Sequence, residues 1–194
     1  MTVNIYQFQN ALRYGTARAN QFRVIFPNIT GSAGLVGQDS ASRMTVLCKA
    51  ASLPSSTIQD LELFYRGRKY HEAGEVDFQA WNCTFINDAS FGVRGLLEAW
   101  SNQIQHRDDI GGETNVSNYK KDIIVQHLDR SGKILREYTL VGAYPTEIGQ
   151  IDLSYDNNSQ VEEFPCTFVY DYFTISRTGS TGLYESYREA DEVV

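Results

Sequence analysis

A strict alternation of apolar and polar residues near one end of the chain most narrows the folds open to it. Every second position of one segment is large or apolar: Phe164, Cys166, Phe168, Tyr170 and Tyr172. Successive side chains of a strand point to opposite faces of a sheet, so the segment predicts one long strand with a single core-facing side. Phe22, Val24 and Phe26 predict a second strand of this kind, which Pro27 ends.

Two turn-like sequences predict β-hairpins. Residues 58–65 lead into RGRK at 66–69, and a return strand begins directly after it. Residues 119–128 and 134–144 flank DRSGK in the same manner.

Three further signals concern strand ends. Residues 43–50 predict another strand, and residues 144–146, which include a proline, predict a turn of the chain. The apolar set changes parity between Ala80 and Trp81, which indicates either a bulge or a passage from one buried face to another.

One strong helix is predicted over about residues 90–106, following Asn87 and Asp88 as candidate capping residues. Its apolar stripe has helical spacing and consists of Val93, Leu96, Leu97, Trp100 and Ile104. A short amphipathic helix is also expected within residues 4–14, after Asn4. We therefore expect a mainly β protein, an antiparallel β-sandwich or barrel with one flanking α-helix.

The length and composition fit one domain. The chain has 194 residues, of which 12% are aromatic, enough to bury a core without disulfides or metals. We expect a single domain over residues 1–177, with long loops at 28–42 and 107–118. Residues 178–194 read as an acidic tail that is mobile or docks on a partner.

The patterns of common active sites and metal sites are missing from the sequence. The cysteines at positions 48, 83 and 166 lack metal-ligand spacing, so we interpret them as buried free thiols in a reducing compartment. His71, His106 and His127 have no nucleophile or acidic partner suggested by spacing. We expect no catalytic residues, no cofactor and no metal. A secretory signal and an apolar run long enough to span a membrane are also missing, which favours the cytosol.

The charges are unevenly distributed along a chain whose net charge is −7. Residues 145–171 contain six acids and no Lys or Arg: Glu147, Asp152, Asp156, Glu162, Glu163 and Asp171. They form either a plain solvated face or a surface that repels a polyanion. Arg66, Arg68 and Lys69 instead crowd one hairpin tip, which could bind a phosphate or, more plausibly in an acidic chain, the acids of a neighbouring copy.

Several ordered sequence blocks make the chain resemble the tail tube proteins of contractile-tailed (myovirus-type) bacteriophages. These blocks lie at residues 18–24, 48–54, 65–69, 85–88, 142–146, 151–156 and 162–172. The resemblance implies a phage tail tube type of β-sandwich or barrel that assembles into hexameric rings. The rings would stack into a hollow tube within a contractile sheath, and the lumen would conduct viral DNA during ejection.

The same resemblance implies roles and partners. The hairpin over residues 58–75 should extend toward an adjacent ring, with a stacking tip formed by Phe64, Tyr65, Arg66, Gly67, Arg68 and Lys69. The acids of residues 145–171 become candidates for the lumen or for interfaces. The implied partners are other copies of this chain, the sheath, baseplate and tail terminator proteins, a tape measure protein in the lumen and DNA passing without sequence-specific binding.

The resemblance leaves other roles open. A tube initiator or terminator, or the tube of a phage-like injection or type VI secretion device, would share the fold. The implied location is the virion tail, after assembly in the host cytoplasm.

Overall fold

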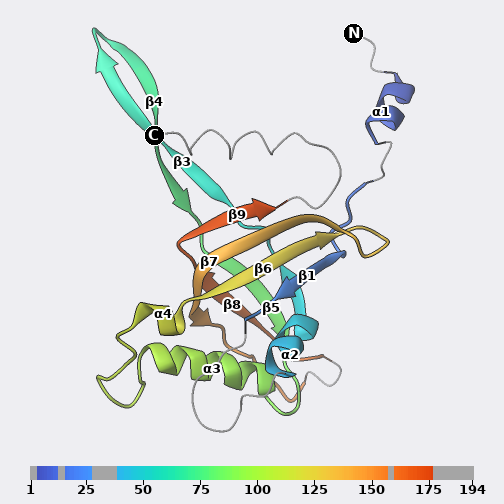
Figure 1. The fold of residues 1–194 in the computed structure, drawn as a ribbon, viewed down its shortest axis with the longest axis vertical. Helices are drawn as coiled ribbons and strands as arrows, with labels where there is room; N and C mark the ends of the chain where they lie inside the picture. The colour runs from blue at the N-terminus through green and yellow to red at the C-terminus, as the bar shows by residue number, and fades with distance from the viewer. Residues whose placement is uncertain (1–3, 13–15, 28–38, 157–159, 177–194) are drawn as a thin grey trace.

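The computed structural model describes residues 4–12, 16–27, 39–156 and 160–176. The acidic tail expected at residues 178–194 lies outside the described residues. So do residues 28–38 of the long loop expected at 28–42. Two antiparallel sheets and a projecting hairpin make up the structure (Figure 1). The predicted mainly β, antiparallel sandwich is confirmed.

One long strand is shared by both sheets of the sandwich. The first sheet has the order β1-β6-β7-β9 and the second β7-β8-β5-β2. The bounds are β1 Phe22–Ile25, β2 Cys48–Ala51, β5 Trp81–Ile86, β6 Lys121–Leu128, β7 Ile134–Ile148, β8 Glu163–Val169 and β9 Tyr172–Ser176. Residues 137–141 of β7 pair with β9, and residues 144–148 pair with β8.

The path of β7 corrects the turn expected at residues 144–146. Pro145 lies inside the strand opposite Phe168, and a register shift follows between Pro145 and Glu147. A proline cannot donate a ladder hydrogen bond, and such an irregularity accommodates it. The change of direction comes slightly earlier, where Gly142 adopts a positive φ of 68°.

The long C-terminal strand is also corrected. It is divided into β8 and β9, because the Asp171 amide donates to the carbonyl of Val141 and leads the chain into the other sheet. Phe164, Cys166, Phe168 and Tyr170 are buried as predicted, whereas Tyr172 is 48% exposed.

Side chains from both sheets fill the space between them. Trp81, Phe85, Phe164 and Phe168 come from the second sheet, and their rings lie within 5.7 Å of a neighbouring core ring. The aromatic Phe26 packs against them from the end of β1. The indole N–H of Trp81 donates to the Ser52 carbonyl over 2.6 Å, so this buried donor is satisfied.

The predicted strong helix is α3 (Gly92–Ile104), with Val93, Leu96, Leu97 and Trp100 buried. The N-cap position is Phe91, whose side chain forms no capping hydrogen bond, and not Asn87 or Asp88. The carboxylate of Asp88 nevertheless accepts a hydrogen bond from the first helical amide, that of Gly92, over 3.0 Å. The Ser90 hydroxyl also donates to this carboxylate, and that bond lowers the pKa of Asp88 from its ordinary value.

A second flanking helix corrects two expectations. Residues 39–42 of the expected loop and most of the expected strand at 43–50 form α2 (Asp39–Leu47), which leads directly into β2. Met44 of α2 is fully buried, and Leu47 and Cys48 follow at helical spacing. Figure 1 shows α2 and α3 together at the end of the sandwich opposite the hairpin, so two helices flank it instead of one.

Two short helices lie outside the sandwich sheets. The helix expected after Asn4 is confirmed as α1 (Ile5–Ala11), where the Asn4 side chain accepts from the Tyr6 amide. The expected loop at 107–118 ends in α4 (Val116–Tyr119). Among the described residues, no helix has the length and apolar character needed to cross a membrane.

The three cysteines are free and buried, as predicted. Burial raises the pKa of Cys166 to about 12 and raises that of Cys83 as well. The thiols of Cys83 and Cys166 therefore stay protonated at neutral pH, and all three cysteines act as small core side chains.

Candidate assembly surfaces

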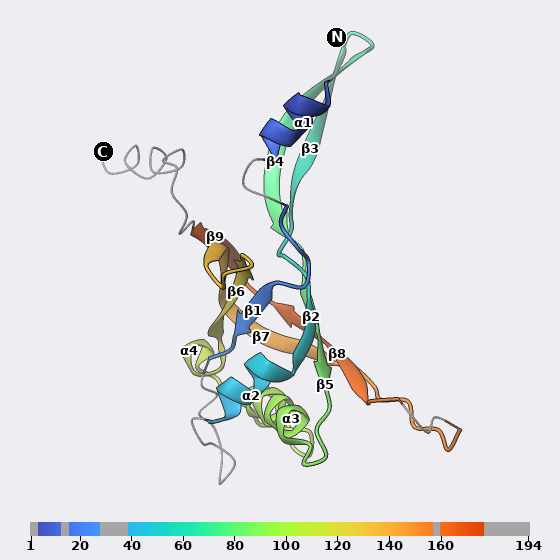
Figure 2. The same ribbon diagram turned by 90° about the vertical axis from the view of Figure 1, so that its right-hand side faces the viewer.

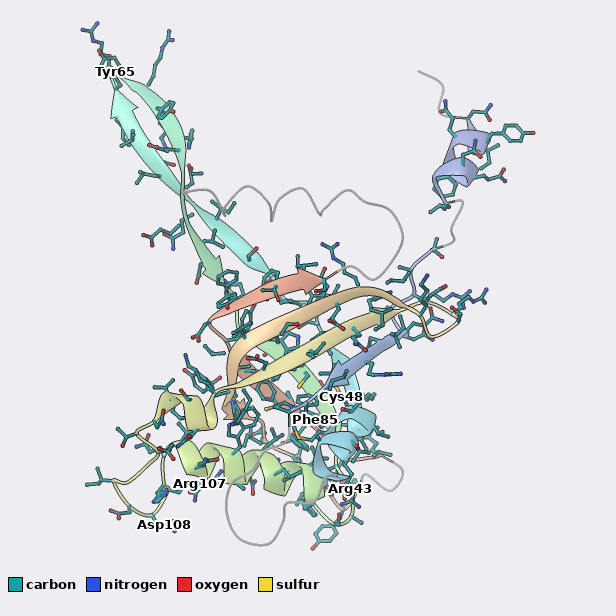
Figure 3. The ribbon with its side chains drawn as sticks, in the orientation of Figure 1. Arg43, Cys48, Tyr65, Phe85, Arg107 and Asp108 are labelled. Atoms are coloured by element: carbon teal, nitrogen blue, oxygen red, sulfur yellow. The ribbon has the colours of Figure 1, made fainter. Side chains whose placement is uncertain are left out.

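The projecting hairpin consists of β3 (Ser56–Tyr65) and β4 (Arg68–Phe78), which pair with each other and with no other strand of the described residues. Arg66 and Gly67 form its turn with φ values of 48° and 79°, the positive values that a two-residue hairpin turn requires. The predicted tip is therefore confirmed as a turn. Figure 3 shows Tyr65 at its far end, whereas Cys48 and Phe85 lie within the sandwich.

Charged and aromatic side chains are interleaved at this tip. The guanidinium of Arg66 lies 5.4 Å from the ring centre of Tyr65, and the ammonium of Lys69 lies 5.4 Å from that of Phe64. Lys69 also donates to Glu62 over 2.7 Å. The tip thus presents cations and aromatic rings together, a combination suited to an acidic and apolar partner surface.

The two faces of the hairpin differ in chemistry. By strand register, Leu61, Leu63, Tyr65 and Tyr70 share one face, with Glu72 opposite Leu61 and Arg68 opposite Tyr65. We call these four large side chains the apolar hairpin face. Their exposed fractions run from 45% for Leu63 to 69% for Tyr65. An isolated two-stranded hairpin is marginal in water, so this face indicates a missing covering partner.

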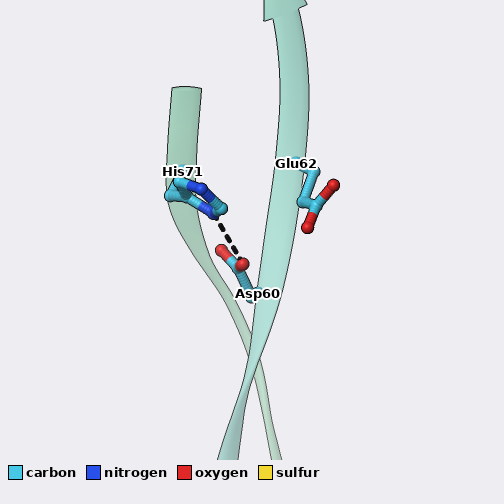
Figure 4. A group of neighbouring side chains, drawn as sticks. All are labelled: Asp60, Glu62 and His71. Atoms are coloured by element: carbon cyan, nitrogen blue, oxygen red, sulfur yellow. Dashed lines mark hydrogen bonds and ion pairs between the residues drawn. The ribbon is translucent and has the colours of Figure 1, made fainter. Parts of the chain in front are cut away.

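The opposite face carries a cluster that sequence spacing did not reveal. Nδ1 of His71 lies 2.7 Å from a carboxylate oxygen of Asp60, and Glu62 is directly opposite His71 in the register (Figure 4). The sequence spacing suggested no acidic partner for His71, and the strand pairing of the hairpin supplies Asp60. One potential ligand atom from each of these side chains lies within 4.8 Å of the others, but all three are exposed and Glu62 is already paired with Lys69.

The structure disperses the six candidate acids of residues 145–171. Glu163 is paired with Lys49, and Asp171 with Lys120. The hydrogen bond from Lys120 to Asp171 raises the pKa of Lys120. Glu162 accepts from the Asn87 amide group over 2.8 Å. The acid-only run of sequence is thus partly neutralised in space by distant lysines.

Glu147 lies on the outward face of the second sheet. Its register partner is Thr167, whose hydroxyl donates to Asn82 over 2.9 Å. Thr84 and Pro165 continue this face, which we call the polar sheet face. Lys49 is the one basic residue in β2, β5, β8 and residues 144–148, and Glu163 pairs with it.

Asp152 and Asp156 lie on the connection between β7 and β8. We call residues 150–156 and 160–162 of this connection the projecting loop. Leu153 is 79% exposed and Tyr155 is fully exposed on it. Figure 2 shows this orange segment reaching outward to one side of the lower body, far from the hairpin tip. The exposed apolar side chains of this loop were not predicted, although the alternating positions of Leu153 and Tyr155 were a signal for them.

Two open depressions lie beside the C-terminal end of α3. One has a volume of about 530 Å³ and is bordered by Ile104, His106 and Tyr144. His106 also borders the second, together with Glu113. Neither brings together the nucleophile, base and orienting group that catalysis requires.

Comparisons with known proteins identify the family of this chain. Residues 17–176 match the model of the family described as phage tail tube protein. The chain belongs to the phage tail tube protein family. Tail tube protein gp19 of Enterobacteria phage T4 is 29% identical over 160 residues, covering 81% of this chain and 90% of that protein. The tail tube protein of Serratia phage KSP90 is 25% identical over 171 residues, covering 87% and 94%.

A solved structure gives the same fold. The sheath/tube terminator of an extracellular contractile injection system, PVC, matches with a TM-score of 0.59 and 14% identity. The match covers 83% of this chain and 96% of that one. This phage tail tube family member is therefore a structural protein of the virion tail, of the contractile-tailed type, and not an enzyme.

Proposed function

We propose that this chain is the repeating subunit of the inner tail tube, forming hexameric rings that stack through the projecting hairpin. The apolar hairpin face carries the proposal, because its four large side chains are uncovered by their own chain. Burying such a face against another copy removes both apolar surface and open strand edges from water. Sheath, baseplate and tail terminator proteins are the further partners, after assembly in the host cytoplasm.

The lumen forms the second part of the proposal. The polar sheet face offers hydroxyl and amide groups with Glu147, and its basic residue Lys49 is neutralised by Glu163. A wall of this kind releases few counterions from a passing polyanion and so holds DNA weakly. We propose that this face lines the channel, through which viral DNA passes and in which a tape measure protein lies before ejection.

Electron microscopy of the purified protein tests the assembly. We expect long tubes of uniform width from the unmodified chain. The triple variant Arg66→Glu, Arg68→Glu, Lys69→Glu should stop at single rings, because it reverses the charge of the tip without touching the core. Circular dichroism should remain that of the unmodified chain.

Three results would separate the alternatives. Monomers at high concentration would contradict a self-assembling tube subunit. Single rings from the unmodified chain would instead favour a tube initiator or terminator. Tubes of normal length from the triple variant would contradict the hairpin as the stacking element.

Lysine substitutions test the lumen. Glu147→Lys with Thr167→Lys should slow DNA release from assembled phage particles, because new cations in a channel attract phosphates. The matched control is Thr174→Lys with Ser176→Lys, which places the same number of new lysines on exposed positions of β9. Equal ejection kinetics for both variants would place the polar sheet face outside the channel.

A further inference from the structure

The hairpin tip and the projecting loop are separated along the long axis of the molecule. Figure 2 shows the hairpin at the top and the loop extending to one side from the lower body. A contact between two different surfaces is head-to-tail, and it forms a closed ring if its rotation closes and an open stack if it does not. Because these two surfaces lie at different heights along the long axis, their contact fits a link between subunits of successive rings.

Charge makes the two segments complementary. Arg66 and Arg68 form no ion pair with other described residues, and neither does Asp152 or Asp156. Two cations on the hairpin tip thus match two anions on the projecting loop. Glu163, by contrast, is already neutralised within its own chain by Lys49.

Apolar side chains accompany these charges on both segments. Phe64 and Tyr65 are 70% and 69% exposed on the hairpin, and Leu153 and Tyr155 are still more exposed on the loop. Aromatic and aliphatic anchors surrounded by polar groups are the usual composition of an interface core and its rim.

We propose that the hairpin tip of one subunit docks on the projecting loop of a subunit in the next ring. Arg66 and Arg68 face Asp152 and Asp156, while Tyr65 packs with Tyr155. The inference rests on the proposed tube function and adds the receiving surface. It assigns these two aspartates to the stacking interface and leaves Glu147 to the lumen.

A cysteine pair tests this contact in assembled tubes. Tyr65→Cys with Tyr155→Cys should give, on mild oxidation, a disulfide ladder that extends beyond the size of one ring. The native cysteines are buried and do not compete. Tyr65→Cys with Ser131→Cys is the matched control, because Ser131 is exposed at the turn between β6 and β7. The control should give no ladder.

The cross-linking outcomes decide the inference separately from the function. A ladder limited to one ring, or none in well-formed tubes, would overturn the proposed contact and leave the tube function standing. Absence of tubes from the unmodified protein would overturn both.

A charge swap provides an independent readout. Arg66→Glu with Arg68→Glu should abolish tubes, and adding Asp152→Arg with Asp156→Arg should restore them. Asp108→Arg with Asp109→Arg gives the same charge change elsewhere and should not restore tubes. Equal recovery with either aspartate pair would show an effect of net charge alone and would overturn the specific contact.

Discussion

The sandwich and the hairpin are both antiparallel β-structure rich in large apolar residues, yet they bury them very differently. Trp81, Phe85 and Phe168 of the sandwich are at most 1% exposed, whereas Tyr65 and Tyr70 of the hairpin are 69% and 61% exposed. The difference lies in the number of layers, because the sandwich has a second sheet and helices while the hairpin has none. In the proposed tube, the hairpin obtains its missing layer from a neighbouring copy.

The largest expected effect contrasts one aromatic side chain from each region. Phe168 is fully buried against Phe26, Trp81 and Trp100, so Phe168→Ala should cost about 3–5 kcal/mol of unfolding free energy. Tyr65→Ala should change the same quantity by less than about 0.5 kcal/mol, because the side chain is exposed. Denaturant unfolding of unassembled protein, followed by tryptophan fluorescence, measures both.

The assembled protein should reverse that contrast. Tyr65→Ala should shorten the tubes without abolishing them, because the side chain becomes buried only between copies while Arg66 and Arg68 remain in the proposed contact. Comparable destabilisation of the unassembled protein by both substitutions would mean that the hairpin packs on its own body.

The confirmed elements of the fold are those with local signals. The alternation of Phe164, Cys166 and Phe168 in the sequence predicts a buried strand face, and all three are buried. Gly67 predicts the turn of the hairpin, where it adopts a positive φ. The parity change before Trp81 also had a real cause, since β4 and β5 belong to different sheets.

The errors lie where local signals are ambiguous. Residues 43–50 are apolar at spacings that suit either a strand or a helix, and burial of Met44 against the other elements selects the helix. A proline usually ends a strand, but Pro145 lies within β7 because the register shifts directly after it. Both outcomes depend on tertiary packing.

The features of the candidate site also divide into those that local sequence predicts and those that depend on tertiary packing. The tip residues are contiguous, so their proximity was predictable. The partners of the acids were not: Lys49 and Glu163 are 114 positions apart, and Lys120 and Asp171 are 51 apart. Such pairs come together only through the order of the strands in the sheets, which the spacing of residues along the sequence does not predict.

Alanine substitutions of one glycine in each region should have smaller and unequal effects on the unfolding free energy. Gly142 has a φ of 68°, and a Cβ there would lie 2.5 Å from a carboxylate oxygen of Asp171. Gly142→Ala therefore strains the backbone and displaces Asp171 from Lys120, for a cost of about 2 kcal/mol in unfolding free energy.

Gly67 is the matched position in the hairpin, with a φ of 79° and open space where a Cβ would lie. Gly67→Ala strains the turn, but the hairpin can open locally without unfolding the sandwich. Its effect on the global unfolding free energy should stay below about 0.5 kcal/mol, while hydrogen exchange of β3 and β4 amides accelerates. A global loss equal to that of Gly142→Ala would show that the hairpin and the sandwich unfold as one cooperative unit, and that the hairpin does not depend on a neighbouring copy for its order.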